Sequence, residues 1–242
     1  MESQYIPIGK AAKIIGVTPT TLRRWEMTGK IKSVRTPTNR RLYLKDQILS
    51  IVNKSIANSA MNWASSPSGE EPEEPYYCPT RDIFQARLDK MLGELLKSSI
   101  PENDAYVVSA ISGEIGNNSF DHNLGSWPDI MGVFFCYAID GGKVKVALAD
   151  RGQGILKTLK AARPDLPNNK EALKVAFTEK ISGRAPESRG NGLKFVRENI
   201  KNRKMSLEFY SGNAKAELND KMKIIGSNQK INGCLAILNL MP

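Results

Sequence analysis

The sequence predicts an α+β fold in which a small all-α part precedes a larger two-layer α/β sandwich. Several segments have apolar residues at helical spacing, and others are apolar-rich runs typical of strands. The helical segments are 8–15, 20–27, 44–56, 82–98, 155–163 and 170–180, with a further helix from 101, and the strand-like segments are 130–139, 144–149, 207–210, 214–218, 222–225 and 233–240. Helices on one side of a mixed sheet would form the sandwich. We expect domains at 1–56 and 81–242, separated by a linker at 57–80.

The composition is that of a globular protein with room for one large domain, or for an ordinary domain and a small one. Of its 242 residues, 40% are hydrophobic and 25% are charged, which is normal for a soluble chain. No apolar run approaches the length of a membrane span, and the start lacks the apolar core of a secretion signal. Cys78, Cys136 and Cys234 lie far apart and fit no metal spacing, which argues against a disulfide framework. We expect a cytoplasmic protein with no membrane partner.

Residues 8–27 have the pattern of a helix-turn-helix. The first helical stretch breaks at Gly16, and Thr18 then provides an N-cap with Pro19 at the first helical position. Gly29 is placed to end the second helix. Two short helices joined by a tight turn form this motif.

Positive charge is concentrated in this part of the chain, which points to double-stranded DNA as a partner. Residues 1–57 hold eleven Lys and Arg against three acidic residues, in a chain of net charge +10. Basic and small polar side chains suit phosphates and base edges in a major groove. The expected DNA contacts are Thr18, Thr20, Thr21, Arg23 and Arg24 of the second helix, and Arg35, Arg40, Arg41 and Tyr43 of a turn-rich hairpin. A basic helical hairpin that binds protein is the alternative.

The same stretch resembles the MerR-type winged helix-turn-helix and its excisionase-like relatives. The matching pieces are Ile8-Gly-Lys-Ala-Ala, Gly16-Val-Thr, Thr21-Leu-Arg-Arg-Trp25-Glu, Arg35-Thr-Pro and Arg41-x-Tyr43. The resemblance implies a recognition helix over 18–28 and a wing that touches the DNA backbone. Full MerR regulators continue into a long dimerising helix and an effector-binding segment. A polar stretch follows here instead, which puts family-style dimerisation and metal sensing in doubt.

The stretch 57–80 is predicted to be a flexible acidic linker. From Ser65 to Pro75 it is rich in Pro, Ser and Glu, and it is poor in aliphatic residues after Trp63. It is interpreted as a solvated spacer. The alternative is that its acidic run folds back on the basic part and competes with DNA.

Three short motifs in the larger part suggest chemistry. Glu114 and Asn118 are four residues apart, so a helix would place this carboxylate and carboxamide on one face, as a water-activating base and a ligand for a hard cation. The strand at 144–149 runs into Asp150-x-Gly152-x-Gly154, which would let the backbone approach a flat ligand. Gly190-x-Gly192-Leu193 opens a helix, and helix N-termini suit phosphate.

In this order and at these spacings, the motifs resemble the N, G1 and G2 boxes of the GHKL ATPases, which implies the Bergerat form of the sandwich. The resemblance covers residues 80–240 and implies that ATP and Mg²⁺ are bound. By this resemblance Asn118 coordinates Mg²⁺, Asp150 bonds the adenine amino group, and Glu114 is the candidate catalytic base. The nucleotide-binding residues carried over are Asn118, His122, Asp150, Gly152, Gly154, Ile155, Arg189, Gly190, Gly192 and Leu193.

The resemblance also assigns a lid that folds over the phosphates, here 156–189. Arg184 and Arg189, with Lys180 and Lys194 near it, are candidates to neutralise phosphate, with solvated lid charges as the alternative.

His122, the single histidine, extends the N-box pattern to one similar to that of anti-sigma-factor serine kinases, which implies that it flanks the triphosphate. A structural, hydrogen-bonded histidine is the alternative.

These features favour a DNA-binding regulator, involved in transcription control, whose affinity for DNA changes with Mg·ATP, for example through a switch between monomer and homodimer. The alternative is a serine/threonine protein kinase of the anti-sigma type, or an ATPase switch, tethered by its helix-turn-helix and acting on a sigma factor or another regulator. A partner protein with a degenerate pocket is a third hypothesis. Whether ATP is hydrolysed, transferred or only sensed is left open by the sequence.

Overall fold

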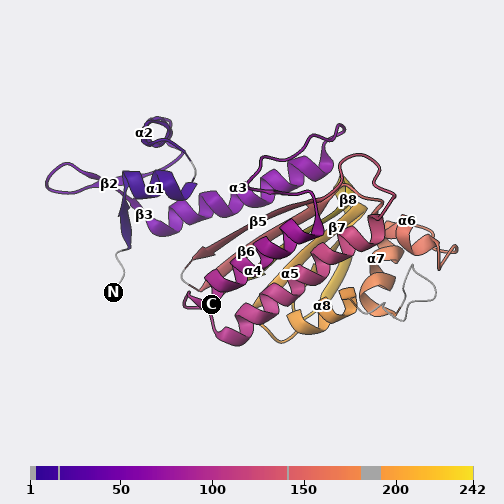
Figure 1. Ribbon diagram of the computed structural model, residues 1–242. Coiled ribbons are helices and arrows are strands. Elements are labelled where there is room, and N and C mark those ends of the chain that lie inside the picture. Colours follow the sequence, from indigo (N-terminus) through magenta and orange to yellow (C-terminus); the bar gives the residue numbers. More distant parts are fainter. Residues whose placement is uncertain (1–3, 16, 141, 181–191, 242) are drawn as a thin grey trace. The chain divides into compact units, whose positions relative to one another are not determined.

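The computed structural model describes residues 4–15, 17–140, 142–180 and 192–241. The chain divides into two compact units, Met1–Ile56 and Ala57–Pro242. Helix α3 (Lys45–Ser65) begins in the first unit and ends in the second (Figure 1). No helix in the described part of the chain is both long enough and apolar enough to cross a bilayer.

The first unit packs its helices against a small antiparallel sheet. The elements besides α3 are β1 (Tyr5–Pro7), α1 (Ile8–Ile15), α2 (Pro19–Met27), β2 (Ser33–Arg35) and β3 (Arg41–Leu44). Over the residues described, the strand order is β1-β3-β2. The expectation of an all-α unit is therefore wrong, although the turn-rich hairpin is present as β2 and β3. Strand β1 was not predicted, because three residues leave no readable alternation in the sequence. The sheet contributes Ile6 and Tyr43, which pair with each other and lie in the core of the unit.

Helix α2 begins where the sequence predicts. The Thr18 backbone is extended, at φ −79° and ψ 153°, and its hydroxyl oxygen accepts a hydrogen bond from the Thr21 amide at 3.1 Å. Pro19 occupies the first turn, where a missing N–H has no cost. Leu22 is the buried residue of α2 and packs in the same core as Ala11 and Ala12 of α1.

The second unit is built on an antiparallel sheet that carries most of its helices on one face. Its strands are β4 (Tyr77–Cys78), β5 (Val133–Asp140), β6 (Lys143–Asp150), β7 (Met205–Leu218) and β8 (Met222–Leu240). Among the described residues they form one sheet in the order β4-β5-β6-β8-β7, and each pairing is antiparallel. The sequence predicted a mixed sheet. Hairpins join β5 to β6 and β7 to β8, and a hairpin imposes the antiparallel arrangement. The pairs β4–β5 and β6–β8 are also antiparallel, although longer connections join them.

Helices α4 (Arg81–Leu96), α5 (Glu102–Asn123) and α8 (Gly192–Ile200) share one apolar core with the sheet (Figure 1). Phe135 on β5 meets Phe84 of α4, with ring centroids 5.3 Å apart. Its neighbour Phe134 points to the opposite face, as alternate strand residues do, and lies 6.1 Å from the Trp63 ring at the end of α3. The outer face of the sheet is thus partly covered by the last turns of α3.

The segment 57–80 differs from the flexible linker that its composition suggests. Residues 57–65 continue α3, with Ala60 and Ala64 fully buried, and Tyr77–Cys78 form the edge strand β4. The Trp63 indole N–H donates to the Glu70 carbonyl at 2.7 Å, which folds the acidic run back towards the helix end. The acidic side chains are exposed to solvent, but hydrogen bonds to other residues of the second unit hold the backbone around them.

In the lid stretch the predicted helices are present as α6 (Gly154–Lys160) and α7 (Asn169–Thr178). Phe177 of α7 packs edge-on against Phe209 of β7. Residues 181–191, which include Arg184, Arg189 and Gly190, lie outside the described residues.

Two glycines allow α4 and α5 to approach closely. A Cβ added at Gly116 would lie 2.1 Å from Cζ of Phe84, and one at Gly113 would lie 3.0 Å from Cδ2 of Leu88. Both glycines are buried in α5, so a side chain at Gly116 would require Phe84 to shift, whereas one at Gly113 would require only a small shift of Leu88.

We expect Gly116→Ala to destabilise the second unit by about 1–3 kcal/mol, because the added methyl group overpacks the contact with Phe84. In an exposed helix the same change would stabilise by up to about 1 kcal/mol. Gly93→Ala is the matched control: Gly93 lies in α4 and has open space where a Cβ would be. Urea denaturation of both variants checks this, and equal stability changes would contradict the packing account.

Candidate functional site

The first motif occupies one face of α5, as predicted from its spacing. Asn118 Nδ2 donates a hydrogen bond to Glu114 Oε1 at 3.2 Å, and both side chains are half-buried. The carboxylate and the carboxamide therefore form one polar pair. Its remaining oxygen atoms are the kind of ligand that a hard cation takes.

The third motif meets this pair directly. A Cβ added at Gly192, the first residue of α8, would lie 1.8 Å from Glu114 Oε1 and 3.0 Å from Asn118 Nδ2. The backbone of α8 therefore begins against the two polar side chains. Leu193, next in the helix, packs against the core and Lys194 is exposed. Of the predicted residues, Arg189 and Gly190 fall outside the described part of the chain.

The second motif sits at the end of β6, next to the same face of α5. Asp150 is 2% exposed, and its Oδ2 accepts a hydrogen bond from the Ser119 hydroxyl at 2.7 Å. Its Oδ1 accepts from the Gly152 amide at 2.8 Å. Because Ser119 follows Asn118 in α5, consecutive residues of one helix contact Asp150 and Glu114. All three motifs thus meet around this part of α5.

Glycines are needed around Asp150 because neighbouring groups already occupy the positions that a Cβ would take. A Cβ at Gly152 would lie 2.1 Å from Nδ2 of Asn123, and one at Gly233 would lie 2.3 Å from the Asp150 carbonyl oxygen. Gly154 has φ +72° and Gly233 has φ +82°, a left-handed backbone that favours glycine. A side chain at Gly152 or Gly233 would therefore force neighbouring residues to move.

Further polar residues hold this loop, and sequence analysis missed them. Asn123 accepts a hydrogen bond from the Gln153 amide at 2.7 Å, and Gln153 Nε2 donates to the His122 carbonyl at 3.1 Å. The Ser211 hydroxyl accepts from the Ile155 amide at 3.0 Å and donates to the Gly233 carbonyl at 3.1 Å. A lone glycine in a strand, as at Gly233, signals a close backbone approach and could have pointed to this position.

Burial raises the pKa of Asp150 from its ordinary value of 3.8 to about 6, and hydrogen bonds from Ser119, Gly152 and Cys234 limit the rise. Burial and the neighbouring Asp150 charge raise the pKa of the Cys234 thiol well above its usual range. A strand-end carboxylate held in this way is an acceptor for a donor group on a ligand. Within the described residues no cluster of three or more His, Cys, Asp or Glu side chains could hold a metal ion.

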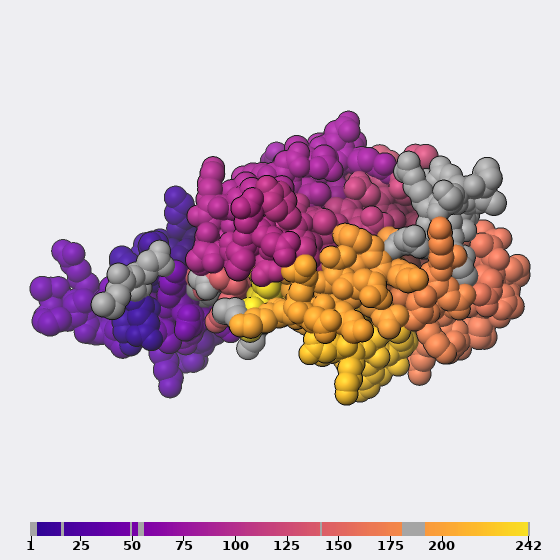
Figure 2. Space-filling model, turned by 90° about the horizontal axis from the view of Figure 1, so that it is seen from below, coloured from indigo at the N-terminus to yellow at the C-terminus, as the bar shows by residue number. Residues whose placement is uncertain are grey.

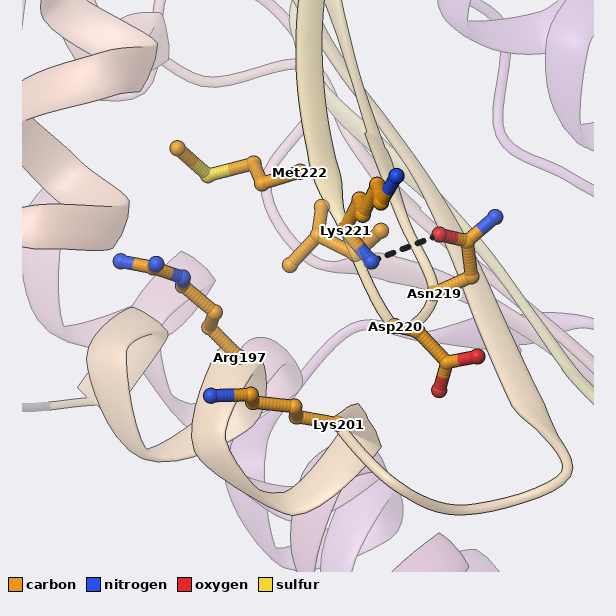
Figure 3. Close-up of a pocket in the computed structure, with 7 residues that line it drawn as sticks. Arg197, Lys201, Asn219, Asp220, Lys221 and Met222 are labelled. Atoms are coloured by element: carbon orange, nitrogen blue, oxygen red, sulfur yellow. Dashed lines mark hydrogen bonds between the residues drawn. The ribbon is translucent and has the colours of Figure 1, made fainter.

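A separate surface pocket lies at the other end of α8. Arg197 lies in the last turn of that helix and Lys201 directly follows it, and residues 218–222 span the end of β7, the turn and the start of β8. Figure 2 shows these two elements adjacent on one face of the second unit. In Figure 3 the Arg197 and Lys201 side chains extend the same way, whereas Asp220 points away. No described residue of the three motifs lines this pocket, which sets it apart from the candidate site.

Most of the side chains predicted to contact DNA are exposed on the surface of the first unit. Thr20, Arg23 and Arg24 are exposed on α2, and Arg35 and Arg40 are exposed on and beside the β2–β3 hairpin. Thr18 and Thr21 are engaged with each other at the helix start. Met27, which sequence analysis did not single out, is 87% exposed at the end of α2.

Two of the predicted DNA contacts are not free surface side chains: Tyr43 is buried, and Arg41 forms an ion pair with Glu26. Tyr43 is 0% exposed and belongs to the core of the unit, so its prediction as a DNA contact is wrong: a buried ring cannot reach DNA. Arg41 Nε donates to Glu26 Oε2 at 2.7 Å. Hydrogen bonds from Ser33 and Arg41 lower the pKa of the Glu26 carboxyl. This ion pair fixes the hairpin to α2 and uses part of the charge of Arg41.

Comparison with known families supports the assignment of the first unit. The MerR family regulatory protein model matches residues 7–43. This match covers α1, α2, β2 and most of β3, so the chain carries a MerR-family helix-turn-helix domain, which is a DNA-binding regulatory domain, at this position. A search of curated proteins found no match to the chain.

The raised pKa of Asp150 predicts how stability changes with pH. The unfolded chain releases this proton near pH 4 and the folded one near pH 6, so the Asp150 contribution to stability is present below pH 4 and falls as the pH rises to 6. The loss is about 3 kcal/mol at most. Asp150→Asn should remove it. Urea denaturation of both proteins between pH 4 and 7 measures the difference, and a difference that does not vary with pH would contradict the assignment.

Proposed function

We propose that the chain is a DNA-binding transcription regulator whose second unit binds Mg·ATP and adjusts the affinity of the first unit for DNA. One observation carries the nucleotide half of this proposal: Glu114, Asn118, Asp150 and Gly192 meet around α5, although they come from segments remote in sequence. The MerR-family match at 7–43 supports the DNA half.

The residues around Asp150 fit a purine. Ser119, Gly152 and Cys234 donate to the carboxylate, and a carboxylate has about four acceptor positions, so one is left for a ligand. The exocyclic amino group of adenine is a donor of the required kind. The glycines on either side, Gly152 and Gly233, let the backbone pack directly against Asn123 and Asp150 and so hold the carboxylate in place.

The residues around Gly192 fit the phosphates. The first turn of α8 presents backbone N–H groups at the positive end of the helix dipole, next to Asn118. Asn118 would hold Mg²⁺ through its amide oxygen, with the phosphates supplying further oxygens. Bound Mg²⁺ would neutralise phosphate charge.

Glu114 supports a second candidate function, phosphoryl transfer. Its carboxylate lies beside Gly192, where the phosphates are proposed, and could accept a proton from a water molecule or from a protein hydroxyl. Release of inorganic phosphate from ATP would indicate an ATPase, and radiolabel from ATP on a protein would indicate a kinase. Glu114→Ala should keep nucleotide binding and lose either reaction.

Asn118→Ala tests the nucleotide site. We expect its affinity for Mg·ATP, measured by calorimetry, to fall by at least about tenfold, because a metal ligand is lost. Asn117→Ala is the matched control, since the preceding residue of α5 points about 100° away around the helix. Equal affinities of the two variants would remove Asn118 from the site. No binding by the wild-type protein at millimolar ATP would overturn the nucleotide half of the proposal.

Arg23→Ala tests the DNA interface. Loss of one phosphate contact should weaken binding to random-sequence duplex DNA and lower the slope of log affinity against log salt by about 1, because one counterion fewer is released. Tyr43→Phe should leave DNA affinity unchanged, since its hydroxyl is buried. Titrations at several salt concentrations, with and without Mg·ATP, measure both the interface and the coupling. An Arg23→Ala slope equal to that of the wild type would exclude the contact.

A further inference from the structure

Arg151 is a buried cation directly after the candidate purine-binding Asp150. Its side chain is 1% exposed. Nε donates to Asp129 Oδ2 at 2.8 Å, and Nη2 lies 2.6 Å from the same oxygen. The Arg151 hydrogen bond lowers the pKa of the Asp129 carboxyl against the effect of its burial. A desolvated cation of this kind needs each of its partners, so it favours a single local geometry.

The other partners of Arg151 belong to the end of α3. Nη1 donates to the Trp63 carbonyl at 2.6 Å and to the Ser66 carbonyl at 2.9 Å. Carbonyls in the last turn of a helix have no intrahelical partner, and a cation suits them. The guanidinium carbon also lies 5.9 Å from the centroid of the Trp63 ring. Arg151 therefore caps the C-terminal end of α3, although it lies more than eighty residues away in the sequence.

Strand β8, which pairs with β6, also provides a hydrogen-bond donor to the Ser66 carbonyl. Asn232 Nδ2 donates to the Ser66 carbonyl at 2.9 Å. Asn232 precedes Gly233, whose added Cβ would meet the Asp150 carbonyl, and Cys234, which pairs with Asp150 in the β6–β8 ladder. The backbone that surrounds the Asp150 carboxylate and the residues that hold the end of α3 are thus the same short stretches.

We propose that Arg151 is a positioning residue that couples nucleotide binding at Asp150 to the order of the last turns of α3. The coupling goes beyond the proposed function, and it rests on that function because the ligand is Mg·ATP. A ligand that fixes the loop after Asp150 also fixes Arg151, and Arg151 then holds the Trp63 and Ser66 carbonyls. Linkage is reciprocal, so a loosened helix end should weaken nucleotide binding by the same factor.

The consequence for DNA follows from the continuity of α3. The helix starts at Lys45 in the unit that carries the helix-turn-helix and ends at Ser65 in the unit that carries the nucleotide site. A nucleotide-dependent change in the order of its last turns is therefore a change in the one helix that both units share.

Hydrogen exchange of amides in residues 57–70 tests the coupling. In the wild-type protein, saturating Mg·ATP should slow exchange there by at least about fivefold. Arg151→Lys keeps the charge opposite Asp129 but cannot reach both carbonyls. Without nucleotide, the amides of residues 57–70 in this variant should exchange faster than those of the wild type, and Mg·ATP should slow them less. The affinity of the variant for Mg·ATP, measured by calorimetry, should be lower. Asn232→Ala should change the same three quantities in the same direction, which keeps the test valid if Arg151→Lys does not fold.

Arg203→Lys is the matched control. Arg203 pairs with Asp104 at 3.0 Å and is remote in sequence from both α3 and the loop after β6. Its exchange in 57–70 and its response to Mg·ATP should equal those of the wild type. If wild-type protein binds Mg·ATP and exchange in 57–70 does not change, or if Arg151→Lys and Asn232→Ala respond as wild type does, the coupling is overturned and the proposed function stands. If wild-type protein binds no Mg·ATP, both fail together.

Discussion

A carboxylate buried at the end of a strand constrains the arrangement of the second unit. Asp150 lies away from water, and a buried charge is tolerated only where donors surround it. Those donors come from Ser119 on α5, from Gly152 in the following loop and from Cys234 on β8. Helix, loop and neighbouring strand must therefore keep their relative register for the carboxylate to be satisfied. The same helix α5 carries Asn118 and Glu114, which lie next to the first turn of α8.

Local features of the site could be predicted from sequence, whereas its tertiary contacts could not. The four-residue spacing of Glu114 and Asn118 and the position of Asp150 after a strand follow from periodicity alone. Ser119 and Asn123 were missed because hydroxyl and amide residues on a helix have many roles, and only the fold shows that these two face a buried loop. Arg151 was missed because a cation beside glycines usually indicates a solvated turn.

In the first unit, the helix start at Thr18 was predicted correctly because capping is a local interaction. Tyr43 was misplaced because the sequence surrounds it with basic residues, whereas β3 turns its ring into the core. The linker was mispredicted for a related reason. Its Pro, Ser and Glu content describes the solvated side chains, but the contacts that order it come from Arg151 and Asn232, which lie far away in sequence.

The sheet of the second unit ends, on one side, in the long strand β7, which pairs only with β8 within the described residues. Lys215 on this strand lies 2.8 Å from Glu208 and 2.8 Å from Glu217, so charged side chains are spaced along it. A row of charges on an outermost strand opposes its extension by a strand from another molecule. Pairing of β7 with a strand from another copy of the protein is therefore disfavoured. Aggregation through this edge strand is disfavoured for the same reason.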